Sequence, residues 1–157
     1  MRLVLMCCLL AACVVLSGCS FTTTFVVVNE SNDQIQIRYI LRKPPNSDAR
    51  VQLVEAPAIK LVSELEQESD WRVLPATRFT FAPETGTVML TLMPKEALRV
   101  QRETDGKCAE ENPKRTKWFP LEEINIIGSA GAVRLTGEQV RRSFVSGLAG
   151  MCVLTYR

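Results

Sequence analysis

Short runs of β-branched and aromatic residues recur along most of this chain, and turn-forming residues separate them. The clearest run covers residues 34–41, where Ile35, Ile37 and Tyr39 alternate with polar or charged side chains. A period of two is typical of a strand with one buried face. Glycine or proline interrupts the chain between most of the other candidate strands, which are 51–54, 71–74, 79–81, 88–93, 98–102, 124–127 and 133–135. Short strands at this spacing predict a mainly β fold, a single antiparallel β-sandwich or small barrel.

Two pairs of these runs predict hairpins. Residues 22–28 are β-branched or aromatic throughout, and the polar cluster Asn29–Asp33 is suited to a turn before the alternating strand. Pro83–Gly86 likewise forms a turn signal between two later runs. We therefore expect one hairpin over 22–42 and another over 79–93. The first turn also contains a glycosylation acceptor motif, but a turn is the favoured interpretation.

Two segments depart from the strand pattern. Residues 58–68 fit either a short helix or an alternating strand, and the sequence leaves both open. Thr136, with Gln139 three residues later, has the spacing of a helix N-terminus, and apolar residues follow at intervals of four. We expect one short C-terminal helix over about 137–148, followed by a terminal strand at 151–156.

The composition excludes several classes of function. The chain has 157 residues, no histidine and a formal net charge of +2. Without histidine it cannot form a Ser-His-Asp or Cys-His nucleophile pair or a histidine-containing zinc site. The near-neutral charge gives no footprint for a nucleic acid, and neither a phosphate-binding glycine loop nor a calcium loop is present. We expect one domain without catalytic residues, metal or cofactor; an enzyme that uses carboxylates or a thiol is the remaining alternative.

The N-terminal segment has the layout of a secretion signal. Arg2 precedes fourteen consecutive apolar residues, Leu3–Leu16. As a helix this run rises about 21 Å, which is short of the roughly 30 Å of hydrocarbon that a permanent membrane span must cross. A cleaved signal therefore fits better than a transmembrane anchor.

The end of this segment, Leu16-Ser17-Gly18-Cys19, resembles the lipobox of bacterial lipoproteins. The resemblance implies cleavage between Gly18 and Cys19, with diacylglyceryl and N-acyl groups added to Cys19. Several acyl chains together make dissociation from a bilayer negligible. The membrane is thus the first partner that the resemblance implies. An ordinary secretory signal with a chance cysteine, or an uncleaved helix, is the alternative.

The same resemblance implies how the chain is divided and where it resides. Residues 1–18 are the expected signal peptide, 19–21 the lipidated N-terminus with a very short tether, and 22–157 a single β-rich domain. Ser20 stands where lipoproteins kept in the inner membrane often carry Asp. The expected location is therefore the outer membrane, with the domain facing the periplasm.

Two cysteines, Cys108 and Cys152, are left unmodified in the mature chain. Because an exported domain enters an oxidising compartment, we expect a disulfide between them. The alternative is a buried Cys152 and an exposed thiol at Cys108. A catalytic cysteine is disfavoured, since no histidine is available to activate it.

Basic and aromatic side chains occur together in one segment, at Lys114, Arg115, Lys117, Trp118 and Phe119. This mixture suits a membrane headgroup region or a partner surface. The alternative, which we favour, is a solvated loop whose two aromatic residues enter the core.

These expectations lead to a ranked set of functions. The first is a lipid-anchored, non-catalytic structural or protein-interaction module with a protein partner in the envelope and no nucleic acid. The second is a binder or carrier of an apolar ligand in the domain interior, which requires a pocket lined by residues such as Met89 and Met93. An enzyme is the third.

Overall fold

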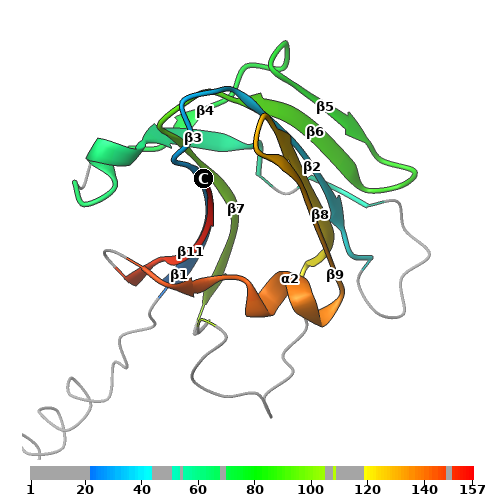
Figure 1. Ribbon diagram of the computed structural model, residues 1–157. Coiled ribbons are helices and arrows are strands. Elements are labelled where there is room, and N and C mark those ends of the chain that lie inside the picture. The colour runs from blue at the N-terminus through cyan, green and yellow to red at the C-terminus, as the bar shows by residue number, and fades with distance from the viewer. Residues whose placement is uncertain are drawn as a thin grey trace, which may run out of the picture.

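The protein folds into two β-sheets that pack face to face (Figure 1). This computed structural model describes residues 22–43, 51–53, 55–67, 70–104, 108, 119–147 and 150–157. Strand order is β10-β11-β1-β7-β3-β4 in the six-stranded sheet and β5-β6-β2-β8-β9 in the five-stranded sheet. The mainly β sandwich expected from the sequence is confirmed.

The elements are short, as their spacing in the sequence predicted. The six-stranded sheet contains β1 (Thr22–Asn29), β3 (Ala58–Leu61), β4 (Arg72–Val73), β7 (Glu96–Thr104), β10 (Val145–Ser146) and β11 (Cys152–Tyr156). The five-stranded sheet contains β2 (Ile35–Leu41), β5 (Phe79–Ala82), β6 (Thr87–Leu92), β8 (Leu121–Gly128) and β9 (Gly131–Thr136). Within the described residues, two short helices connect strands: the 3-10 helix η1 (Val62–Glu64) and α2 (Glu138–Arg142).

The predicted hairpin over 22–42 is wrong, because β1 and β2 belong to different sheets. β1 lies between β7 and β11, and β2 lies between β6 and β8. In β1, Phe25 and Val27 point into the space between the sheets, whereas Val26 and Val28 point to the outer side and are also buried. An uninterrupted apolar run of this kind is typical of a central strand that is covered on both faces.

The chain crosses from one sheet to the other after Asn29, which is fully buried. Its Nδ2 donates hydrogen bonds to the carbonyl oxygens of Asp33 at 2.8 Å, Met93 at 3.1 Å and Leu92 at 3.3 Å. Its Oδ1 accepts from the backbone N–H and the hydroxyl of Ser31. The expected turn is therefore present, but it joins two sheets. Because the Asn29 amide is enclosed, the glycosylation acceptor motif is closed in the folded chain.

The second hairpin is confirmed, with β5 antiparallel to β6 through Pro83–Gly86. Gly86 has φ +66°, and a Cβ there would lie 2.8 Å from the carbonyl oxygen of Leu41. Residues 58–68 contain both of the alternatives that the sequence left open, since β3 runs directly into η1. The strand expected at 51–54 is not formed by residues 51–53, although Val51 is buried.

The C-terminal helix is shorter than the expected 137–148. Thr136 is the last residue of β9, and Gly137, with φ +55°, precedes α2 without a side-chain cap. The apolar spacing did identify inward-facing residues, because Val140 and Phe144 are both fully buried. Phe144, however, follows the end of the helix, and the chain then pairs with β11 as β10.

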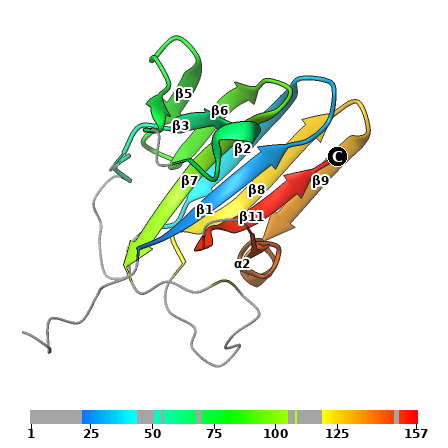
Figure 2. The same cartoon turned by 90° about the vertical axis from the view of Figure 1, so that its left-hand side faces the viewer.

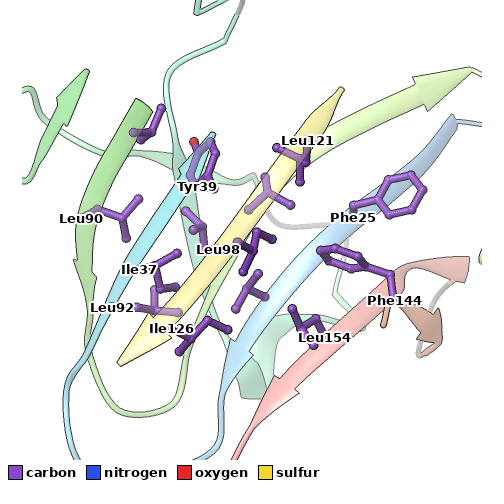
Figure 3. Close-up of a cluster of buried hydrophobic side chains, with 14 of the residues drawn as sticks. Phe25, Ile37, Tyr39, Leu90, Leu92, Leu98, Leu121, Ile126, Phe144 and Leu154 are labelled. Carbon is purple, nitrogen blue, oxygen red and sulfur yellow. The ribbon is translucent and has the colours of Figure 1, made fainter. Parts of the chain in front are cut away.

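One continuous apolar cluster fills the space between the sheets, with side chains from both sheets pointing toward one another (Figure 3). The ring of Phe25 lies 5.0 Å from that of Phe119 and 5.5 Å from that of Phe144, centroid to centroid. Cys152 is buried in this cluster and forms the expected disulfide with Cys108. The bond ties the segment after β7 to the start of β11.

Register fixes which ends of the strands lie together. Thr22 at the start of β1 pairs with Thr104 at the end of β7. Leu41 at the end of β2 pairs with Leu121 at the start of β8. These termini lie toward the end of the sandwich where α2 is found (Figure 2). β1 and β11 pair in parallel, with Asn29 opposite Tyr156, so the turn after Asn29 and the end of β11 lie together at the opposite end.

Asn29→Asp should lower the free energy of unfolding by about 3 kcal/mol, because a carboxylate would face carbonyl oxygens and lose the amide donors. Urea unfolding near neutral pH measures the change. Asn32→Asp is the matched control, since it makes the same chemical change on an exposed residue of the same turn. Equal effects of the two substitutions would show that the buried Asn29 amide does not stabilise the connection between the two sheets.

Cys108→Ala should lower the free energy of unfolding by up to about 4 kcal/mol, the chain-entropy value for a loop of this length. The two cysteines are 44 residues apart in the sequence. Denaturant unfolding with and without reductant measures the loss. Reductant should bring the unsubstituted protein to the level of the variant and leave the variant unchanged; stability that does not respond to either change would contradict the bond.

Candidate interaction surface

The outer face of the six-stranded sheet is covered by the protein's own chain. Val26 and Val28 point to that side and are only 0% and 3% exposed. Leu65, just beyond η1, and Met151, just before β11, close over them in a second, smaller apolar cluster. Much of this sheet is therefore closed to a partner.

Trp71 extends this cover together with charged side chains. The Arg99 guanidinium lies 5.6 Å from the centroid of the Trp71 ring, and Lys60 Nζ lies 6.0 Å from it. Glu55 accepts a hydrogen bond from Arg102 at 2.7 Å and forms an ion pair with Arg99 at 3.2 Å. The hydrogen bond from Arg102, aided by the charges of both arginines, holds the pKa of Glu55 below its ordinary value. Arg99 thus contacts both Trp71 and Glu55, and we interpret these groups as structural.

The outer face of the five-stranded sheet carries its side chains in three rows that run across the strands. The middle row consists of Thr80, Met89, Arg38, Asn125 and Arg134. The row toward α2 consists of Ala82, Thr87, Ile40, Glu123 and Thr136. The row on the other side consists of Thr91, Gln36, Ile127 and Ala132. We refer to these three rows as the open face.

The open face exposes apolar side chains that a second layer would normally cover. Met89 and Ile127 are 50% and 46% exposed. Their strand neighbours Leu90 and Ile126 point inward and are buried in the core. Exposed apolar groups among polar ones mark surfaces that meet a partner.

Two arginines share one carboxylate on this face. Arg38 donates to Glu123 Oε1 at 2.7 Å, and Arg134 donates to Glu123 Oε2 at 2.8 Å. The Glu123 side chain is only 10% exposed, whereas the side chains of Arg38 and Arg134 are 40% and 67% exposed. The acid therefore lies beneath the arginines, and a partner that approaches this face meets guanidinium groups.

The ion pairs change the acid strength of these groups. The hydrogen bond from Arg134, with the charges of Arg134 and Arg38, holds the pKa of Glu123 below its ordinary value of 4.5, against the opposing effect of burial. The same contact raises the pKa of Arg134. Glu123 is accordingly ionised at neutral pH and forms an ion pair with each of the two arginines.

A groove of about 350 Å³ crosses the open face between β5 and β8. Met89 and Ile127 give it apolar walls, and Gln36 and Asn125 line it with amide groups. Arg78, at one side of the groove, donates to Glu96 at 3.2 Å and to the carbonyl oxygen of Thr91 at 3.4 Å. The groove therefore offers apolar contacts, amides and guanidinium groups together.

The residues named from the sequence lie at different places. Cys108 and Cys152 are joined, and Phe119 is 5% exposed within the core, as the loop interpretation of its segment expected. The described residues do not include Gly18, Cys19, Lys114, Arg115, Lys117 and Trp118.

The two methionines expected to line an interior pocket for an apolar ligand lie outside the core. Met89 points outward into the groove, and Met93 lies 43% exposed in the turn after β6. Within the described part of the chain, no group of three or more metal-ligating side chains comes together. The helices described there are all too short or too polar to cross a bilayer.

Sequence reasoning did not identify the open face. Arg38 was visible as one of the polar residues in the alternating run, and that pattern indicates only which side of a strand faces solvent. Its contact with Glu123 and its closeness to Arg134 arise because β2 pairs with β8, and β8 with β9, more than 80 residues further along the chain. A single sequence contains no signal for that register.

Comparisons of the chain with protein-family models, with curated proteins and with solved structures found no match.

Glu123→Gln should lower the free energy of unfolding at neutral pH and change how that free energy varies with pH. Because the folded pKa of Glu123 lies below the ordinary 4.5, its stabilising effect is complete above that pH and is lost as the pH falls through the folded value. The difference in unfolding free energy between the variant and the parent should therefore narrow in acid. Urea unfolding across the range from neutral to acid measures it.

Glu122→Gln is the matched control, since it removes the same charge from the adjacent residue of β8, which is exposed. A Glu123→Gln difference that stays constant across the acid range would contradict the ion-pair origin.

Proposed function

We propose that this protein is a lipid-anchored lipoprotein of the bacterial envelope, and that its domain acts on the periplasmic side as a non-catalytic interaction module. The open face is the surface we assign to its protein partner. The observation that carries this proposal is the difference between the two sheets. The chain covers the outer side of one sheet with its own residues and leaves Met89, Ile127 and two guanidinium groups exposed on the other.

The anchor is supported by the lipobox and by the position of the first strand. β1 begins at Thr22, three residues after Cys19. Three extended residues span about 10 Å, so an acylated Cys19 would hold the domain close to the lipid. The end of the sandwich that contains the start of β1 and the end of β7 would then face the bilayer.

This orientation leaves the open face accessible. The strands of the five-stranded sheet run between the end near the anchor and the opposite end, so that the open face is a side of the domain. A partner in the periplasm could reach it without displacing lipid. Rigid strands that display side chains in fixed rows suit recognition.

The disulfide agrees with an exported, non-catalytic domain. Bonds of this kind form and persist in oxidising compartments such as the periplasm. A thiol enzyme would need Cys108 as a thiolate, but its sulfur is bonded to Cys152. This supports the interaction module over the thiol-based alternative.

A carrier of an apolar ligand is less well supported by the geometry. The inward faces of the two sheets share one continuous apolar cluster that includes three aromatic rings. The groove opens on the outer side, where guanidinium and amide groups are adapted to a polar partner.

Cys19→Ala should release the protein from membranes, because the sulfur that carries the lipid is lost. Fractionation of cells, with mass spectrometry of the N-terminal peptide, measures both location and added acyl mass. Cys13→Ala is the matched control, since it removes a cysteine from the apolar run and should leave the anchor intact. Membrane residence of the Cys19→Ala protein, or an unsubstituted N-terminus without acyl mass, would refute the anchor.

A further inference from the structure

We propose that the open face binds an acidic segment of a partner polypeptide in an extended conformation, and that Arg38 and Arg134 contact its carboxylates. This inference rests on the proposed function and names the chemistry of the partner.

The first argument is that the positive groups of this face are more exposed than the negative groups that bind them. Arg38, Arg78 and Arg134 are the outermost charged groups, with side chains 40%, 36% and 67% exposed. Glu123 and Glu96, which bind them, are each only 10% exposed. A surface with acids beneath and guanidinium groups above presents positive charge, even though the pairs nearly balance. Complementary charge on a partner is therefore negative.

The second argument is the hydrogen-bonding capacity that remains. A guanidinium carries five N–H donors in a planar fork that matches a carboxylate. The contact with Glu123 takes one nitrogen of Arg38 and one of Arg134. Of the side chains in the three rows, Glu123 is the sole acid. An additional carboxylate for Arg38 and Arg134 therefore has to come from outside these rows.

The third argument is spacing. Arg38 and Arg134 lie in one row, on either side of Asn125. Their backbones are about 10 Å apart, because adjacent strands are separated by about 4.8 Å, and both side chains lean toward Glu123 between them. Carboxylates two residues apart in an extended chain lie on one face at about 7 Å. Two such groups are within reach of the two arginines.

The remaining groups on the face fit a polypeptide better than a membrane. Met89 and Ile127 offer contacts for aliphatic side chains, and the amides of Gln36 and Asn125 can pair with peptide groups. A bilayer would meet the end of the sandwich where β1 starts, whereas the rows lie on its side. An acidic segment with some apolar side chains uses every kind of group that the groove contains.

The test is fluorescence anisotropy with the full lipidated protein in detergent micelles. The probe is a labelled peptide of alternating Glu and Thr, and the control peptide replaces each Glu by Gln. The acidic peptide should bind, the Gln peptide should not, and affinity should fall as salt rises, because exposed charges are screened. Equal binding of the two peptides, or affinity that does not respond to salt, would overturn the proposal.

Three variants locate the binding on the open face. Arg38→Gln and Arg134→Gln should each weaken binding about fivefold, the upper range for an exposed ion pair. Either variant leaves Glu123 with its other arginine, so that the sheet keeps an ion pair on this face. Arg142→Gln is the control, since that residue pairs with Glu138 on α2, outside the three rows. Equal affinities of Arg38→Gln, Arg134→Gln and the control would refute the site.

Glu123→Gln separates a binding role from a structural one. Removing the buried acid frees the donors of both arginines and raises the positive charge of the face, so the acidic peptide should bind more tightly. If Glu123 only holds the arginines in place for folding, the same substitution would weaken binding. That result would count against the proposal.

Failure of this inference can be distinguished from failure of the proposed lipid anchor. If Cys19→Ala is released from membranes but the acidic peptide binds the Arg38→Gln variant as well as the parent, the proposed function survives and this inference is wrong. If Arg38→Gln instead reduces binding of the released protein to phosphatidylglycerol vesicles, and the peptide does not bind, the face binds lipid and the inference is likewise wrong. If Cys19→Ala remains on membranes, the anchor fails while the peptide result still decides the inference.

Discussion

Burial of β1 on both faces is the constraint on which the rest of the structure depends. Phe25 and Val27 need the core between the sheets, and Val26 and Val28 need a second apolar layer on the outer side. The chain supplies that layer with η1, the residues around it and the segment before β11. Apolar side chains of these sizes each contribute about 1.5–3 kcal/mol when they are buried, so a strand covered on both sides is a large part of the stability of a small domain. The five-stranded sheet, whose strands alternate, needs only one covered face.

This difference explains why a candidate surface exists on one sheet and not on the other. In β2, Ile35 and Ile37 fill the core while Gln36 and Arg38 stay outside. No second layer is required there, and the residues that the structure describes do not form one over Met89. The pattern of side chains along each strand thus decides which face of the sandwich remains open to another molecule.

Much of the fold could be predicted from local signals. Alternation identified β2, and a turn between two runs identified the β5–β6 hairpin, because both signals lie within a few residues. The partners of β1 were not predictable in that way. A polar cluster such as 29–33 is equally suited to a tight hairpin and to a crossing between sheets. At the crossing, Asn29 contacts the carbonyl oxygens of Leu92 and Met93, which are more than 60 residues away and which no local signal reveals.

The candidate surface shows the same contrast between local signals and contacts of distant residues. The resemblance to a lipobox depends on four adjacent residues, whereas the ion pairs of Glu123 require the register of three strands. The expected helix was too long for a related reason: the spacing of Val140 and Phe144 showed that both are buried, and pairing of β10 with β11 decided that the second is not helical.

The parallel pairing of β1 with β11 also sets the order of events during synthesis. Phe25 emerges early but meets its neighbour Cys152 only after most of the chain has been made. Until then an apolar strand lacks a hydrogen-bonding partner along one edge, a condition that favours aggregation. Contacts between such distant residues also form slowly. The nascent chain therefore exposes this edge of β1 until β11 has been made.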